Sequence, residues 1–388
     1  MREYLGQFTP VILGAALVTV ASTPLFRRLS FAVGAVQRPD ERRVHTQPTA
    51  LLGGAAILLG FLAGMGVAWQ TDRFDEVFRA SSVPLGVVLA SLVIFAVGQI
   101  DDLREVSPPA KIAGTVFAGS ILSIAGVSIL FFRIPFGGLL SLSPDMSALL
   151  TVVWVIGMST AINYVDGLDG LATGIVAIGA AALLLYCERL FGAGAISEDN
   201  AGPIVAAAVL GACIGFLPHN FHPAKIFMGD AGALLLGLLM AAATIAVGGN
   251  TDTPFSGQTF FFFAPLFIPL VILGVPIIDT AFSIVRRARR GAGVTVADKD
   301  HLHHRLMRLG HGQRRSVLIL WAWTVLLSAI ALYPTYKQGQ GDLYIPVAIA
   351  VAALLLYTWF GPGVRSRREN EDAEEQGREP SNSESRLR

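Results

Sequence analysis

Charged residues are scarce in this chain of 388 residues. Asp, Glu, Lys and Arg make up 15% of it, hydrophobic residues make up 53%, and the mean hydropathy is +0.60. A soluble domain carries about 25% charged residues. The composition therefore excludes an ordinary soluble enzyme and indicates an integral membrane protein, for which we expect the bilayer and no nucleic acid as a partner.

Cysteines and soluble nucleotide-binding motifs are also lacking. The only cysteines, Cys187 and Cys213, lie in or beside apolar segments without the Cys/His spacing of a metal site. We interpret both as packing residues. No Walker loop, Rossmann fingerprint or kinase motif occurs, which excludes the common soluble nucleotide-binding folds.

What the chain has instead is long apolar segments. A membrane-spanning helix needs about 20 mostly apolar residues, and this rule predicts an all-α polytopic membrane protein with about eleven transmembrane helices. Residues 1–361 form the predicted transmembrane domain, and residues 362–388 a disordered tail. The expected spans are 8–26, 50–69, 83–100, 112–131, 148–162, 171–187, 202–217, 232–248, 260–285, 316–334 and 343–360.

The distribution of basic residues predicts the orientation of these spans. Most of the 29 Lys and Arg residues fall in one set of alternate loops, which the positive-inside rule assigns to the cytoplasm. This arrangement places the N-terminus outside and the C-terminus inside. The opposite set of loops holds only Arg2, Arg73, Arg79, Arg133, Arg189 and Lys337.

The polar stretch 163–171 lies directly between two apolar runs. It contains Asn163, Asp166 and Asp169. A carboxylate at a membrane boundary is normally solvated, paired or metal-bound, because an unpaired charge in low dielectric is costly. If this stretch is a helical turn, the two acids share one face.

Two further acidic sites lie at the predicted cytoplasmic ends of spans. Asp101 and Asp102 follow the apolar run 91–100, with Lys111 nine residues beyond. A solvated turn or a cap is the alternative, but adjacent side chains point differently, so one acid can face a metal or proton and the other the scaffold. Asp230, between Gly229 and Gly232, is either an N-cap or an oxygen ligand for Mg²⁺.

The remaining cytoplasmic loops are basic. The first contains His45, followed by Gly53 and Gly54, which permit close approach of the backbone to an anion. The longest, 286–315, contains a histidine-rich run that suits a diphosphate better than zinc, because it has no Cys and its arginine repels a cation. That run comprises His301, His303, His304 and Arg305.

Together these cytoplasmic clusters predict an active site at the membrane face. Carboxylates, histidines, Lys111 and arginines in this combination suit magnesium-assisted phosphoryl transfer from a cytosolic diphosphate to a lipid phosphate. A multispan transporter or flippase is the alternative from another functional class. It predicts charges near helix midpoints, where Asp279 is the only acid deep in an expected span.

At this point the chain resembles the polyprenyl-phosphate N-acetylhexosamine-1-phosphate transferases, which form glycosyltransferase family 4. The resemblance runs from about residue 38 to 320, with several motifs in the family's order. These are Arg42-Arg43-x-His45-x-x-Pro48, Asp101-Asp102, Asn163-x-x-Asp166-Gly-x-Asp169-Gly, Phe227-Met-Gly-Asp230-x-Gly and Asp298-x-x-His301-Leu-His303-His304-Arg305.

The resemblance implies an enzyme of the bacterial cytoplasmic membrane that moves a sugar 1-phosphate from a UDP-sugar to undecaprenyl or decaprenyl phosphate, releasing UMP. The histidine run is more similar to the branch that uses UDP-N-acetylglucosamine than to the branch that uses UDP-N-acetylmuramoyl-pentapeptide. Mg²⁺ is the implied cofactor, with Mn²⁺ as an alternative, and a homodimer is left open.

The resemblance also implies roles for individual residues. Asp230 and Asn163 are the implied metal site, and Asp101 and Asp102 the pair that activates the acceptor. Lys111 is the implied contact to the lipid phosphate. The other implied substrate-binding residues are His45, Asp166, Asp169, Asn220, Phe227, His301, His303, His304 and Arg305.

Overall fold

A computed structural model of the protein describes residues 2–37, 48–104, 106–134, 138–248, 306–307, 309–336 and 344–360, and residues 274, 277 and 281 singly. The described part is predominantly helical. Its helices are α1 (Arg2–Gly6), α2 (Thr9–Val33), α3 (Gly53–Trp69), η1 (Asp72–Phe74), α4 (Asp75–Ala80), α5 (Val83–Arg104), α6 (Pro108–Ile124), α7 (Pro144–Val165), α8 (Leu171–Gly192), α9 (Gly202–Asn220), α10 (Gly229–Gly248), α14 (Gln313–Tyr336) and α15 (Tyr344–Phe360).

Two short antiparallel ribbons complete the described secondary structure. β1 (Val36–Gln37) pairs with β2 (Thr49–Ala50), and β3 (Phe131–Ile134) pairs with β4 (Gly138–Ser141). β2 is also bridged to the segment before α10, because Phe227 N donates a hydrogen bond to Ala50 O at 2.9 Å. This bridge joins the start of α3 to the start of α10.

The prediction of a polytopic helical membrane protein is confirmed. Seven helical segments of the described residues are long and apolar enough to cross a membrane, or eight if α3 and the helical segment after it count as one broken span. Those two parts meet at a bend of 88°, and the second part lies between the expected spans 50–69 and 83–100. Ten of the eleven expected spans coincide with a helix, but α6 and α15 are not among those of membrane length, so the count of eleven is not confirmed. The span expected at 260–285 lies outside the described residues except at the three single positions.

Some predicted boundaries were wrong. The span expected at 112–131 ends at Ile124, because Gly126 adopts a left-handed φ of 96° and the chain then enters the β3–β4 ribbon. The span expected from 232 begins at Gly229, so Asp230 belongs to the first turn of α10. The predicted tail from 362 lies outside the described residues, whereas Cys187 and Cys213 are free and buried, as expected.

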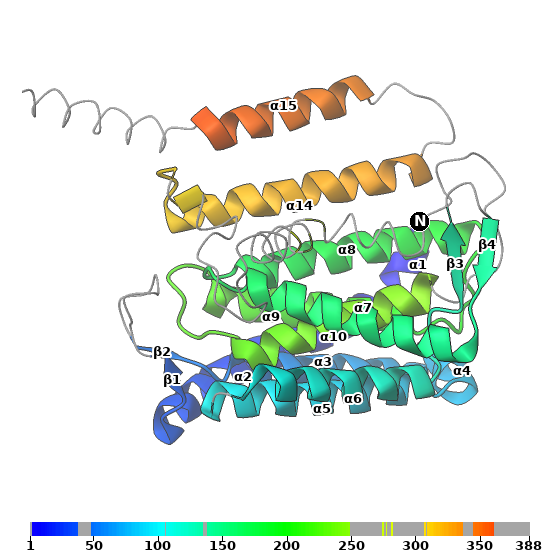
Figure 1. The fold of residues 1–388 in the computed structure, drawn as a ribbon, viewed down its shortest axis with the longest axis horizontal. Coiled ribbons are helices and arrows are strands. Elements are labelled where there is room, and N and C mark those ends of the chain that lie inside the picture. The colour runs from blue at the N-terminus through cyan, green and yellow to red at the C-terminus, as the bar shows by residue number, and fades with distance from the viewer. Residues whose placement is uncertain are drawn as a thin grey trace, which may run out of the picture.

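α10 is the central helix of the bundle. Its entire membrane-length window is buried, and it contacts α3, α5, α7, α8 and α9. In Figure 1 the helices lie side by side, with α14 next to α8 and α15 beyond α14 at one edge. Small residues allow this packing, since a Cβ at Gly237 would lie 2.4 Å from Ser159 Cα of α7.

The close approach of α10 and α7 generates a stability prediction. Gly237→Ala should lower the melting temperature of the detergent-solubilised protein, because the added methyl overlaps α7 backbone and overpacking costs about 1–3 kcal/mol. Gly157→Ala is the matched control, since nothing lies within 4 Å of the added Cβ there. Equal melting temperatures for the two variants would show that α7 and α10 are not packed this closely.

Candidate active site

Polar side chains from four helices converge at the N-terminus of α10. Asn163 Nδ2 of α7 donates to Asp230 Oδ1 of α10 at 3.0 Å. Lys111 Nζ of α6 pairs with Asp230 Oδ2 and with Asp101 of α5. We call Asp101, Asp102, Lys111, Asn163 and Asp230 the Asp230 cluster. The structure thus brings together five residues that the sequence singled out in four separate segments.

The adjacent acids Asp101 and Asp102 point in different directions, as expected. Asp101 Oδ1 accepts a hydrogen bond from Val106 N at 2.6 Å, and its other oxygen faces Lys111. Asp102 Oδ1 and Oδ2 accept from the backbone N–H groups of Asp230 at 2.8 Å and Ala231 at 3.0 Å. Asp102 therefore satisfies two amides that a helix start leaves unpaired, and its negative charge suits the positive end of the α10 dipole.

Two glycines permit this contact between α5 and α10. Gly229 has a φ of 66°, and a Cβ there would lie 2.4 Å from Asp102 Oδ2. On α5, a Cβ at Gly98 would lie 2.4 Å from Ala231 Cα. Any side chain at either position would separate the helices, so these glycines determine where Asp230 lies relative to Asp101.

The two acids of the 163–171 stretch do not share a helical face, because α7 ends at Val165 and Asp166 has a non-helical ψ of 53°. Asp169 Oδ2 accepts from Ala224 N at 3.0 Å and contacts His222 Nδ1 at 2.8 Å, so it organises the loop after α9. Among described residues, His222 is a functional candidate to which no sequence motif pointed. Its only signal was its place in the polar run 218–225.

Asp166 differs from Asp169 in having no hydrogen-bond donor among the described residues. Burial, together with the nearby carboxylates of Asp230, Asp102 and Asp169, raises the pKa of Asp166 to about 8. Such a carboxyl group is neutral or needs a cation. Its position beside Asp230 shows that the local field favours binding of positive charge.

Asn220, an implied substrate-binding residue, is buried at the C-terminal end of α9. The residue is 2% exposed; its Oδ1 accepts from Thr173 Oγ1 at 2.8 Å, and its Nδ2 donates to Ile226 O at 3.0 Å. These hydrogen bonds hold the chain between α9 and α10, and the substrate-binding role of Asn220 stays a prediction. Phe227 is half-buried, and its carbonyl accepts from Gly53 N at 3.0 Å.

The basic part of the predicted site lies outside the described residues. This applies to His45 in the first loop and to the histidine-rich run, and their substrate-binding roles stay predictions. The residues concerned are His45, His301, His303, His304 and Arg305.

The donor set of the Asp230 cluster fits a divalent cation with few protein ligands. Within the described ranges, no three His, Cys, Asp or Glu side chains surround a common point. Mg²⁺ does not need three such side chains, because it retains water ligands and also binds phosphate oxygens of the substrate. The Lys111 ammonium already lies between two carboxylates, and the Asp230 side chain is 33% exposed. The cluster thus holds a cation in a place that remains accessible.

The match to a known protein family covers the segment of the chain that carries the Asp230 cluster. The model of glycosyl transferase family 4 matches residues 84–248, which include α5 to α10 and the whole Asp230 cluster. A decaprenyl-phosphate N-acetylglucosaminephosphotransferase of Mycolicibacterium smegmatis is 38% identical over 90% of this chain and 88% of its own.

Two other relatives differ in their names. A probable undecaprenyl-phosphate N-acetylglucosaminyl 1-phosphate transferase of Bacillus subtilis is 32% identical over 81% of this chain and 82% of its own. A phospho-N-acetylmuramoyl-pentapeptide-transferase of Mycobacterium leprae is 29% identical over 87% of this chain and 98% of its own. The chain is thus more similar to relatives named for N-acetylglucosamine.

The capping role of Asp102 predicts a local loss of order. Asp102→Ala leaves two amides of α10 without their acceptor, which costs about 1–3 kcal/mol. Hydrogen exchange measured by mass spectrometry should be faster in the peptide that contains Asp230 and Ala231. Asp145→Ala, which removes an exposed carboxylate from the first turn of α7, is the control. Unchanged exchange in Asp102→Ala would refute the capping role.

The raised pKa of Asp166 predicts a pH dependence of stability. A carboxyl group with a folded-state pKa of about 8 and an ordinary value of 3.8 binds its proton more tightly in the folded state. The Asp166 carboxyl group therefore does not lower the free energy of unfolding below about pH 4. Its destabilising effect grows as the pH rises and is complete above about pH 8. In metal-free buffer, Asp166→Asn should raise the melting temperature at about pH 8.5 and leave it unchanged at about pH 4. An equal shift at both pH values would contradict the raised pKa.

Proposed function

Because the chain belongs to glycosyl transferase family 4, we propose that it transfers N-acetylglucosamine 1-phosphate from UDP-N-acetylglucosamine to a polyprenyl phosphate, releasing UMP. The observation that carries the proposal is the convergence of Asp101, Lys111, Asn163 and Asp230 at one end of the membrane helices. The relatives from Mycolicibacterium smegmatis and Bacillus subtilis, named for N-acetylglucosamine and for deca- or undecaprenyl phosphate, support the donor and acceptor.

The lower identity to the muramoyl-pentapeptide transferase, 29% against 38%, supports N-acetylglucosamine over the larger donor. A transporter is less well supported, because the charged residues of the Asp230 cluster lie near the ends of α5, α6 and α10 and not at helix midpoints. Asp279, the acid expected deep in a span, lies outside the described residues.

Mg²⁺, or Mn²⁺ in its place, would be held by Asp230 and by the amide oxygen of Asn163. When bound, the metal neutralises charge on the donor's phosphates. Asn163 Nδ2 donates to Asp230 Oδ1, which fixes the Asp230 carboxylate. The same hydrogen bond leaves the amide oxygen of Asn163 to bind the metal. Asp102 acts as a positioning residue, because it holds the backbone of Asp230.

In the proposed reaction, an oxygen of the lipid phosphate attacks the β-phosphorus of the donor. The new P–O bond forms as the bond to the α-phosphate oxygen breaks, and UMP leaves with that oxygen. A phosphate monoester is already a nucleophile at neutral pH, so the protein mainly positions it. Lys111 supplies positive charge for the attacking phosphate, and Asp101 orients Lys111 or accepts a remaining proton.

Direct attack is favoured over a covalent aspartyl intermediate by the hydrogen bonds of the two acids. Both oxygens of Asp102 accept backbone amides, and those of Asp101 face Val106 N and Lys111. A carboxylate so engaged is a poor nucleophile, because attack requires a free oxygen.

We propose that this site faces the cytoplasm, with the N-terminus of the chain outside. The uneven distribution of Lys and Arg residues between the two sets of loops supports the orientation. A UDP-sugar is made in the cytosol, so a cytoplasmic site has direct access to its donor.

The test is UMP release by purified protein with polyprenyl phosphate, Mg²⁺ and either donor. We expect turnover with UDP-N-acetylglucosamine and little with UDP-N-acetylmuramoyl-pentapeptide. Asp230→Asn should reduce turnover by at least about a hundred-fold, since it removes the charge of the proposed metal ligand. Asp145→Asn, at the other end of α7, should retain activity. Preference for the pentapeptide donor, or normal turnover in Asp230→Asn, would refute the proposal.

A further inference from the structure

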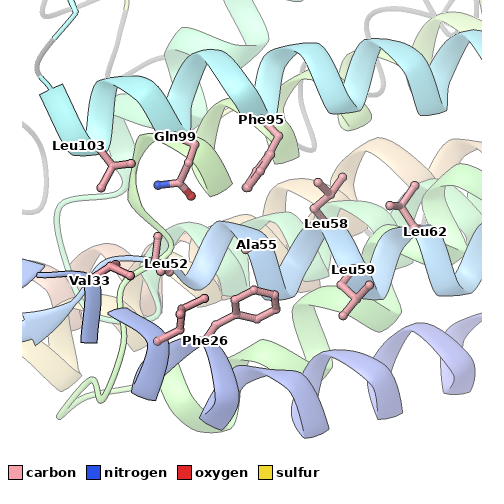
Figure 2. Close-up of a pocket in the computed structure, with 11 residues that line it drawn as sticks. Phe26, Val33, Leu52, Ala55, Leu58, Leu59, Leu62, Phe95, Gln99 and Leu103 are labelled. Carbon is pink, nitrogen blue, oxygen red and sulfur yellow. The ribbon is translucent and has the colours of Figure 1, made fainter. Parts of the chain in front are cut away.

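An apolar pocket of about 650 Å³ lies between α2, α3 and α5, apart from the Asp230 cluster. It occupies the C-terminal parts of α2 and α5 and the N-terminal half of α3, so it adjoins the end of the bundle that carries the cluster. Figure 2 shows its side chains converging from the three helices. Its lining consists of Phe26, Leu29, Val33, Leu52, Ala55, Leu58, Leu59, Leu62, Phe95, Gln99 and Leu103.

Gln99 is the one polar residue in this lining. Its side chain points from α5 into the pocket (Figure 2), and its buried Nε2 has no hydrogen-bond partner among the residues that the structure describes. A buried donor left unpaired costs free energy, so such groups normally find an acceptor. The lining offers none, because the other ten side chains are hydrocarbon.

The pocket is on the wrong side of α5 to lead to the Asp230 cluster. Gln99 and Asp101 are two residues apart, which separates them by about 200° around the helix. Asp101 faces Lys111 on α6, whereas Gln99 faces α3. The pocket and the Asp230 cluster therefore lie on different sides of α5.

We propose that the pocket binds one acyl chain of a diacylglycerophospholipid, whose ester carbonyl accepts a hydrogen bond from Gln99 Nε2 when the side-chain amide rotates to meet it. A hydrocarbon-lined cavity in a membrane domain excludes water and is filled by lipid chains. Gln99 lies five residues before the end of α5, or about 7.5 Å below it, near the depth of the ester groups in a bilayer. An isoprenoid chain carries no carbonyl and would leave Gln99 unpaired.

The bound chain would support the active end of the bundle. α3 supplies Leu52 and Ala55 to the pocket, and Gly53 and Gly54 between them donate backbone hydrogen bonds to Phe227 O and Met228 O, directly before α10. Filling the pocket therefore holds the segment on which the start of α10 rests. This inference is independent of the proposed function.

The test compares a synthetic diester phosphatidylglycerol with its diether analogue, which lacks the ester carbonyls. Binding to the full-length protein in detergent is measured by native mass spectrometry. We expect the diester to bind about five-fold more tightly, the size of one net hydrogen bond. Gln99→Leu should remove this preference by weakening only the diester. Equal binding of the two lipids to the unaltered protein would overturn the proposal.

A second pair of variants tests the location. Ala55→Phe fills the pocket and should lower the binding of both lipids at least about five-fold, whereas Ala21→Phe, on the exposed face of α2, should not. Polyprenyl phosphate added in equal amount should not displace the diester. Displacement, or equal effects of the two Phe variants, would show that the bound acyl chain lies elsewhere. If Ala55→Phe does not fold, the Gln99→Leu comparison decides the proposal alone.

Discussion

The contact between Asp102 and the first amides of α10 is the interaction on which the rest of the site depends. It fixes α5 against α10 where Asp230 and Asp101 must lie close together. It is possible only because Gly98 and Gly229 carry no side chains. A charged group is thus used at the membrane boundary as a helix cap, where two backbone amides and the helix dipole offset the cost of burying it.

Charge balance is the second constraint. The carboxyl groups of Asp101, Asp102, Asp166 and Asp230 lie near one another, and Lys111 pairs with two of them, Asp101 and Asp230. Backbone amides stabilise Asp102, and Asn163 stabilises Asp230, but Asp166 has no such donor among the described residues. An excess of negative charge that the fold leaves unsatisfied attracts a cation, which is the electrostatic need of a site that handles diphosphates.

The helices could be predicted because each apolar run of membrane length has few other ways to satisfy its backbone. The divergence of Asp101 and Asp102 followed from adjacency alone. Other features depend on contacts between distant segments. The burial of Asn220 requires Thr173 from α8, and the pairing of Asp169 with His222 requires the loop after α9. The pocket at Gln99 exists only where α2, α3 and α5 diverge, which no local pattern encodes.

The complete burial of α10 has a consequence for how the protein is made. The helices that it contacts most, α3, α5, α7, α8 and α9, all precede it in the chain. The ribosome therefore makes α10 after these neighbours, and α10 must pack between helices that precede it in the chain. Its Gly- and Ala-rich surface suits late insertion into a narrow gap. The Asp230 cluster can therefore form only after α10 has been made, because Asp230 is the last of its five residues in the chain.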